Sequence, residues 1–488
     1  MMKFILPALL AMFLVGCSVG PDYTRPETDV PTEFAYADST VLVDTTMIAV
    51  ADTGWWELFG DTVLTDLIQT ALTENNDVQI AAARVEQYMG LYGVTKSDFF
   101  PKIDAGAIGT RGQSALITDY VGKRPTTSTF EVNVSAAWEI DLWGKVRRAT
   151  EAAKADLLAS EEARRGVVLS VTALVASSYI DLLELDKELT IAKLTAQSRE
   201  QSLKLFEERK GKGDVSDLEL SQIESQYWLA MARIPAIEQN IVQAENAISV
   251  LLGRNPGPIP RGLVLDSLAL PGVPEGLPSE LLERRPDVRE AEELLRGANA
   301  RIGVAKAYYF PSISLTGLFG VASGGLSNLF TGESQVWRVT GQVFQPIFHW
   351  GEISGQVDAA EAIQKQALYG YVNTVHRAFA DAENILVERT RTEQQRDAER
   401  NQVKALRTYE RLARMRYKEG VTSYLEVLDA ERTLFDTELS YAQTQARLSK
   451  SVVGIYRAFA GGWLDWASAK AVLPSDPVER REPEKAEK

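Results

Sequence analysis

The chain has 488 residues, a formal net charge of −15 at pH 7, 45% hydrophobic residues and 24% charged residues. This composition is typical of a folded protein and argues against an intrinsically disordered chain or a polytopic helical membrane protein. The acidic balance, without a dense basic patch, gives no support to nucleic-acid binding.

The N-terminus has the features of a secretory signal followed by a lipidation site. Residues 1–16 contain Lys3 and an apolar run that is too short for a good membrane span, so we predict a signal peptide. The run ends in LVGC, which resembles the lipobox of bacterial lipoproteins, and Cys17 is the only cysteine in the chain. We therefore predict that the mature chain begins at Cys17 and is acylated there, without any intrachain disulfide. Ser18 follows in place of an aspartate, which resembles lipoproteins sorted to the outer membrane.

Residues 17–60 are polar, contain several prolines and lack periodicity, so we expect a lipidated, extended N-terminal segment. A helix is predicted from about 61 to 97, because Leu64, Leu67 and Ile68 begin an apolar stripe at helical spacing.

The stretch from 129 to 143 alternates between apolar and polar residues. Its apolar positions are Phe130, Val132, Val134, Ala136, Trp138, Ile140 and Leu142. A half-buried strand of a soluble sandwich is the commoner source of such a pattern, but the length and the lipoprotein signal favour a strand of a membrane β-barrel. Residues 103–121 give a weaker partner strand.

A long helical pattern follows from 144 to about 210, with apolar or small residues at alternating spacings of three and four. This heptad pattern is typical of a coiled coil, and a helix of that length would be about 100 Å long. Gly213 suits the left-handed residue that ends a helix, and Ser216 with Glu219 predicts a capping box that opens a return helix.

The same order of elements recurs at an offset of 207 residues, at which Gly213, Ser216 and Glu219 fall on Gly420, Ser423 and Glu426. We therefore predict an internally duplicated chain, with a second capping box at Ser423 and Glu426. Repeat 1 covers 61–254, a proline-rich linker 255–278, repeat 2 279–462 and a C-terminal tail 463–488. Repeat 2 supplies strands at about 313–322 and 336–348, followed by a second pair of long helices.

Four membrane strands per chain cannot close a barrel, because an open sheet edge in hydrocarbon leaves backbone groups unpaired at several kcal/mol each. The barrel must therefore be shared between chains, which predicts an obligate oligomer. Helices of about 100 Å are too long for the membrane and must project from it. A β-barrel continued by a helical barrel is a tube, and a tube anchored in an outer membrane conducts something across it.

Several motifs resemble one family: VGPDY from residue 19, WWELF from 55, ERRPDVREAEELLRGANARIGVAKAYYFPSISLTG from 283 and RYKEGVTSYLEVLDAERTLF from 416. Over nearly its whole length the chain resembles the TolC-like outer-membrane factors, in the OprM-type (NodT-like) branch of efflux lipoproteins. The resemblance implies a homotrimer in the outer membrane, with a shared 12-stranded β-barrel continued by a coiled-coil α-helical barrel in the periplasm. It implies a passive exit duct for drugs or other small molecules, supplied by a periplasmic adaptor (membrane fusion) protein and an inner-membrane transporter of the resistance-nodulation-division type.

The resemblance also implies a periplasmic gate after the second turn. Acidic residues that line the narrow end of the tunnel correspond to Glu426 and Asp429, which lie three apart and so on one helix face. Leu425 resembles an apolar constriction, Arg432 a basic residue one turn away, and Tyr417 a tyrosine of the polar network that holds the end shut. Thr422 departs from the founding member of the family, which has an arginine there. Without the resemblance, the charged residues would indicate only an exposed helix face with weak ion pairs.

The two turns are also expected to dock the adaptor. The docking residues that we predict are Gly213, Val215, Ser216, Gly420, Val421 and Ser423. The two turns are unequal, because Gln222 and Ser225 stand where Asp429 and Arg432 stand in the second copy.

Other classes of function have less support. The chain has two histidines, His349 and His376, and no nucleophile-elbow, P-loop or zinc-type spacing, so we predict neither an enzyme nor a cofactor or resident metal. A duct for metal efflux or type I secretion stays open, although no Cys, Met or His cluster favours metal. A periplasmic coiled-coil scaffold would not need alternating strands.

The lipobox prediction can be tested directly. Replacing Cys17 with alanine removes the only thiol that can be acylated, so Cys17→Ala should abolish incorporation of radiolabelled palmitate. Continued labelling of the variant would refute the assignment.

Overall fold

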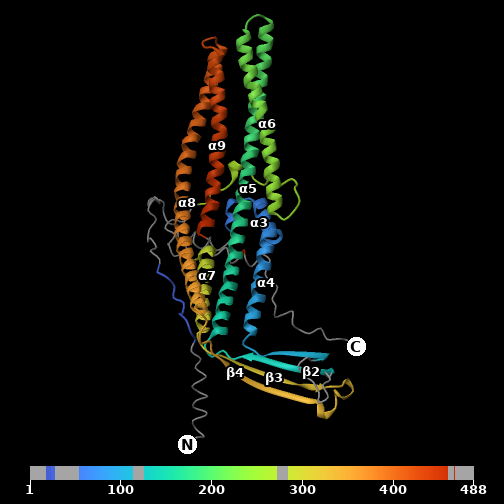
Figure 1. Ribbon diagram of the computed structural model, residues 1–488. Coiled ribbons are helices and arrows are strands. Elements are labelled where there is room, and N and C mark those ends of the chain that lie inside the picture. Colours follow the sequence, from blue (N-terminus) through green and yellow to red (C-terminus); the bar gives the residue numbers. More distant parts are fainter. Residues whose placement is uncertain (1–17, 28–53, 114–125, 272–283, 460–466, 468–488) are drawn as a thin grey trace. The chain divides into compact units, whose positions relative to one another are not determined.

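The computed structural model describes residues 18–27, 54–113, 126–271, 284–459 and 467 (Figure 1). The predicted signal peptide, Cys17 and most of the predicted tail lie outside these residues. The α-helices are α3 (Thr62–Glu74), α4 (Asn76–Ser97), α5 (Lys145–Gly211), α6 (Asp217–Leu251), α7 (Pro286–Ala307), α8 (Glu352–Lys418) and α9 (Tyr424–Phe459). The strands are β1 (Lys102–Gln113), β2 (Thr126–Glu139), β3 (Ser312–Ser323) and β4 (Gln335–Phe344). Short 3-10 helices are η1 (Trp55–Phe59), η2 (Leu265–Ser267), η4 (Leu326–Asn328) and η5 (Gly332–Ser334).

The prediction of a mixed α and β chain, mostly helical with four strands, is confirmed. Helices α5 and α8 each have 67 residues, which makes each about 100 Å long. The chain divides into two compact units, and each unit takes segments from both predicted repeats. Unit 1 consists of 1–27, 86–160 and 290–372, and unit 2 of 28–85, 161–289 and 373–488.

Unit 1 contains an antiparallel sheet in the order β1-β2-β3-β4 (Figure 1). One row of paired residues across all four strands is Ala105, Val134, Phe319 and Trp337, and the next row is Asp104, Ser135, Leu318 and Arg338. Because successive side chains of a strand point to opposite faces, the sheet has one apolar face and one mainly polar face. The larger side chains of the apolar row are exposed in the single chain.

Two strands end earlier than predicted. β2 ends at Glu139 rather than at 143, because Asp141 turns its carboxylate to two backbone N–H groups in the first turn of α5, each at 3.0 Å. β4 ends at Phe344 rather than at 348, because Pro346 has no N–H to donate to a strand ladder. β1 is described to Gln113, so residues 114–121 of its predicted range lie outside the described residues.

The helix predicted from 61 to 97 is wrong in one respect, because it is broken at Asn75 into α3 and α4. Oδ1 of Asn75 accepts hydrogen bonds from the N–H groups of Asp77 at 2.8 Å and Val78 at 3.1 Å, which caps α4. Its Nδ2 donates to the carbonyl oxygen of Leu251 at 2.8 Å, at the end of α6. An asparagine inside an apolar stripe thus ends one helix and begins the next.

Residues 18–27 form an extended segment, here called the strap, which lies against the helices of unit 1. Gly20 has a φ of 101°, and a Cβ atom on it would lie 2.5 Å from Cα of Gly303 in α7, so only glycine fits. The buried guanidinium of Arg148 in α5 donates to the carbonyl oxygen of Val19 at 3.3 Å and to Asp22 Oδ1 at 2.6 Å. The strap is further held by Asn299, which donates to Pro21 O, by Tyr23, which donates to Glu292, and by Arg25, which pairs with Glu292.

The largest buried cluster of unit 2 is built around η1. Trp55, Trp56 and Phe59 are fully buried, and Trp55 stacks on Tyr456 of α9 with ring centroids 5.3 Å apart. They pack with apolar residues of α3, α5, α6 and α9, including Leu64, Ile68, Val175, Ile180, Ile248 and Val453. The WWELF motif is therefore a core element.

A buried carboxylate ties this core to the segment after α6. Asp61 accepts hydrogen bonds from the N–H of Val63 at 2.9 Å, from the Tyr179 hydroxyl at 2.9 Å and from the N–H of Leu263 at 2.8 Å. The N–H of Gly262 donates to the same hydroxyl at 2.9 Å. A Cβ atom at Gly262 would lie 2.1 Å from Asp61 Oδ1, so this position requires glycine.

Asp61→Ala should lower the free energy of unfolding by about 2–4 kcal/mol, because it leaves a buried hydroxyl and a buried N–H without their acceptor. The midpoint of thermal unfolding in detergent measures this. The matched control is Asp66→Ala, at an exposed position of α3. Equal midpoints for the two variants would show that Asp61 does not hold unit 2 together.

Candidate gate at the hairpin ends

Two helical hairpins of unit 2 carry the predicted site. Hairpin 1 is formed by α5 and α6 and turns at Gly213, and hairpin 2 is formed by α8 and α9 and turns at Gly420 (Figure 1). The φ angles of the two glycines are 83° and 69°, in the left-handed region. In hairpin 2 the N–H of Gly420 donates to Tyr417 O at 3.0 Å and the next N–H donates to Arg416 O at 2.9 Å. The corresponding pair of bonds closes hairpin 1, so both turns are Schellman motifs.

The return helices begin differently in the two hairpins. In hairpin 1 the predicted capping box is confirmed, since the side chains of Ser216 and Glu219 each bind the other residue's backbone N–H. In hairpin 2 the predicted capping box is wrong. The carboxylate of Glu426 accepts from Arg416 Nη1 at 3.1 Å and from the Thr422 hydroxyl instead. Thr422, which departs from the founding member of the family, thus helps to hold a predicted gate residue.

An aromatic cluster joins the two hairpins next to the turns. Phe206 of α5 stacks with Tyr417 of α8 at 5.9 Å between ring centroids and contacts Tyr424 of α9 at 4.5 Å. Arg209 of α5 donates to the Tyr417 hydroxyl at 3.1 Å and also lies over its ring. Burial raises the pKa of Tyr424 to about 12. Tyr417 therefore takes part in a polar contact between the two hairpins.

The other predicted gate residues occupy the outer face of α9. Leu425 is 61% exposed. Asp429 and Arg432 are both exposed and form an ion pair with 3.0 Å between Oδ1 and Nη2. The carboxylate of Glu426 is partly covered and is turned toward Thr422 and Arg416. Spacing placed Glu426 and Asp429 on one face, but their side chains have different partners.

The residues predicted to dock an adaptor surround both turns. Gly213, Ser216, Gly420, Val421 and Ser423 are exposed. Val215 is half-buried and packs against the aromatic cluster, so it supports the turn from inside.

Beside the outer face, the structure contains buried charges that sequence reasoning missed. Glu431 is 8% exposed and Arg199 is 2% exposed. Burial raises the pKa of Glu431, opposed by the positive charges of Arg414 and Arg199. The available signal was the position of Glu431 on the same helical stripe as Tyr424 and Leu428, where a charged residue is out of place.

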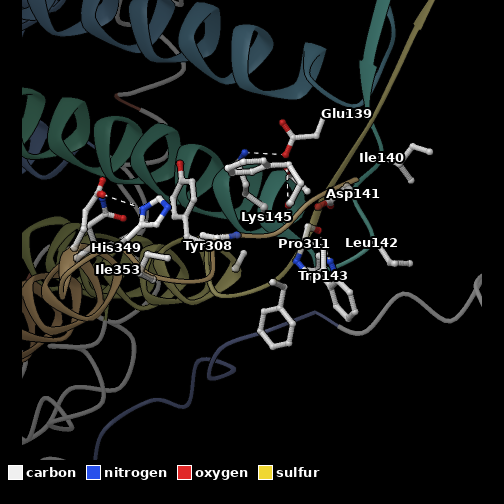
Figure 2. A pocket seen from close by; sticks show the side chains of 17 residues that line it. Glu139, Ile140, Asp141, Leu142, Trp143, Lys145, Tyr308, Pro311, His349 and Ile353 are labelled. Atoms are coloured by element: carbon white, nitrogen blue, oxygen red, sulfur yellow. Dashed lines mark hydrogen bonds and ion pairs between the residues drawn. The ribbon is translucent and has the colours of Figure 1, made fainter. Parts of the chain in front are cut away.

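Unit 1 contains a separate cavity of about 510 Å³ at the base of the sheet (Figure 2). Aromatic and aliphatic side chains line it, together with the ion pair of Lys145 and Glu139 at 2.8 Å and with Nδ1 of His349, which lies 3.1 Å from Glu352 Oε2. His349 thus pairs with a carboxylate at the beginning of α8. Within the described part of the chain, no three His, Cys, Asp or Glu side chains gather closely enough to hold a metal ion.

The comparisons with known proteins agree with this architecture. A family model described as outer membrane efflux protein matches residues 67–254 and 277–461. The probable efflux pump outer membrane protein TtgC of Pseudomonas putida is 34% identical over 460 residues, which is 94% of this chain and 95% of TtgC. The cation efflux system protein CusC of Escherichia coli O157:H7 is 33% identical over 465 residues, 94% and 98% of the two chains.

Solved structures give the same result. CusC aligns with a TM-score of 0.81 at 32% identity and covers 91% of this chain and 99% of its own. The open-state MtrE outer membrane channel of Neisseria gonorrhoeae aligns with a TM-score of 0.82 at 32% identity, over 92% and 99% of the chains.

A two-faced sheet joined to long helical hairpins defines the class of outer-membrane efflux channels. The chain belongs to the outer membrane efflux protein family, whose model matches most of its length. The predicted family, the general role as an exit duct for efflux and the outer-membrane location are thereby confirmed.

Proposed function

We propose that the protein is the homotrimeric outer-membrane duct of a tripartite efflux pump, which passively conducts drugs or other small molecules to the exterior. The observation that carries this proposal is the sheet, which has one apolar face, one mainly polar face and two edge strands, β1 and β4. A lipid-facing surface must be apolar and a water-filled lumen must be polar. The pump is completed by a periplasmic adaptor and an inner-membrane transporter of the resistance-nodulation-division type.

The edge strands explain why one copy of the chain is insufficient to close a barrel. In the part of the sheet that the structure describes, the outer edges of β1 and β4 have no neighbouring strand. Each unpaired backbone group in hydrocarbon costs several kcal/mol, so β4 of one copy pairs with β1 of the next. Because the strands alternate in direction, this seam is antiparallel like the others. Three copies of the four-stranded sheet give a barrel of twelve strands.

A disulfide across this seam tests the shared barrel. We expect Val339→Cys in β4, combined in turn with Ala105→Cys or Ala107→Cys in β1, to give covalent dimers and trimers in oxidised outer membranes for at least one pair. Within one chain β2 and β3 intervene, so the two cysteines would be about 14 Å apart and beyond the roughly 7 Å limit of a disulfide. Val339→Cys alone is the control, and monomers from every pair would contradict the seam.

The outer face of α9 is proposed as the gate. In a trimer, Leu425, Asp429 and Arg432 of the three copies would surround the axis at the periplasmic end, and like charges would repel unless each is paired. The Asp429–Arg432 pair supplies that compensation within each copy. Arg209, Tyr417, Thr422 and Glu426 hold the turns in position. We propose the exposed turn residues as the surface on which the adaptor docks.

Asp429→Ala removes this compensation and leaves Arg432 unpaired. Conductance in planar bilayers should rise by up to about fivefold, because an exposed ion pair contributes at most about 1 kcal/mol. The matched control is Gln222→Ala, at the equivalent position of hairpin 1. Unchanged conductance of Asp429→Ala relative to this control would place the constriction elsewhere.

The kind of cargo is proposed from the names of the relatives and from the side chains of the described residues. Relatives are named for the efflux of toluene, antibiotics and cations, so the same architecture serves unlike molecules. Since no three potential metal ligands gather among the described residues, we assign selection to the transporter rather than to the duct.

A further inference from the structure

We propose that Glu431 is a buried positioning residue of the gate, whose carboxylate alternates between Arg414 and Arg199 and sets the position of α9. This inference rests on the gate proposed above. It adds a buried charged residue to α9, beside the exposed face that carries Asp429 and Arg432.

Arg414 holds Glu431 in this structure. Nη2 of Arg414 in α8 lies 2.7 Å from Glu431 Oε1 in α9, although the contact lacks the angle of a hydrogen bond. The same Nη2 donates to the Ser198 hydroxyl of α5 at 2.9 Å, and Nε donates to Glu410. Arg414 thus connects both helices of hairpin 2 to hairpin 1.

Arg199 is the second candidate partner for the same carboxylate. It belongs to α5, is 2% exposed, and lies over the Phe435 ring of α9 at 5.3 Å. Its Nη1 donates to Gln226 O of α6 at 2.7 Å, whereas its buried Nε and Nη2 have no hydrogen-bond partner among the described residues. Burial lowers the pKa of Arg199, and the negative charges of Glu431 and Asp436 oppose that effect.

A buried guanidinium with unused donors is costly, since such groups are normally hydrogen-bonded. A small displacement of α9 toward α5 would bring the Glu431 carboxylate to the unused donors of Arg199. Arg414 would retain its hydrogen bonds to Glu410 and Ser198. Glu431 can therefore be held within hairpin 2 by Arg414 or between the hairpins by Arg199. These two arrangements are discrete, which is what a two-position element requires.

The partner that binds Glu431 affects the lumen through the position of α9. Tyr424, Val427, Leu428 and Glu431 face inward and are buried, whereas Leu425, Asp429 and Arg432 are exposed on another face of the helix. Because both faces belong to one rigid helix, a shift that moves Glu431 also moves the ion pair of the gate.

A double-mutant cycle on the full-length protein in planar bilayers tests the proposal. Glu431→Gln keeps the shape but loses the charge that the unused donors of Arg199 would bind, so conductance should fall by roughly 2- to 30-fold, the range of such coupling effects. Arg199→Met removes the second partner and should lower conductance and sensitise cells to the pump's substrates. In the Arg199→Met background, the additional change Glu431→Gln should have a much smaller effect on conductance than in wild type. Glu431 can no longer change its partner from Arg414 to Arg199 in that background.

Matched controls separate this effect from stability. Arg407 and Glu438 form an exposed ion pair between the same two helices with an N–O distance of 2.7 Å, and Glu438→Gln should leave conductance unchanged. All variants are compared as trimers of equal heat-modifiable migration. If Glu431→Gln does not assemble into trimers, the conductance of Arg199→Met tests the proposal by itself. Wild-type conductance in Arg199→Met would then overturn the proposal.

Independent effects of Glu431→Gln and Arg199→Met, multiplying in the double variant, also overturn it. Failure of the gate itself is distinguishable, because then Asp429→Ala is silent as well. If Asp429→Ala is active and the buried variants are silent, the gate stands and only the shared carboxylate is refuted.

Discussion

The constraint on which the structure depends is that backbone N–H and C=O groups in hydrocarbon must find partners within protein. The sheet of a single chain satisfies this between its four strands but presents two edges, together with an exposed apolar face. A soluble protein would cover that face, as unit 2 covers Trp55 and Trp56 with helices. In the barrel proposed above, lipid covers the apolar face and further copies of the chain pair with the edges, so assembly and membrane insertion would satisfy the same requirement.

Much of this architecture can be predicted from the sequence, because its elements are long and regular. Period-two alternation marks β2, and heptad spacing marks α5, over enough residues that local exceptions do not matter. The glycines that end the long helices are also predictable, since Gly213 and Gly420 adopt the left-handed conformation that other residues avoid. Asn75 was not predictable as a break, because its side chain competes with the helix only when the carbonyl oxygen of Leu251 is near.

The site was predictable to a lesser degree. Spacing places Leu425, Asp429 and Arg432 on one face of α9, and the structure leaves that face exposed. Spacing does not determine that Glu426 turns back to Thr422, because this depends on the conformation of the turn. The buried charges of Arg199, Arg414 and Glu431 belong to three helices, and α5 is linked to the other two by Arg414 with Ser198 and by Arg199 with Phe435. Contacts between residues more than two hundred positions apart leave no local pattern in a single sequence.

The strap also constrains the junction between sheet and helix. Ser18 is packed so closely against Gly144 that a Cβ atom there would lie 2.8 Å from the serine hydroxyl oxygen. Gly144 stands where the chain passes from β2 into α5, so the strap begins at that junction. Any side chain at position 144 would therefore displace the first residues of the strap from the point at which strand gives way to helix.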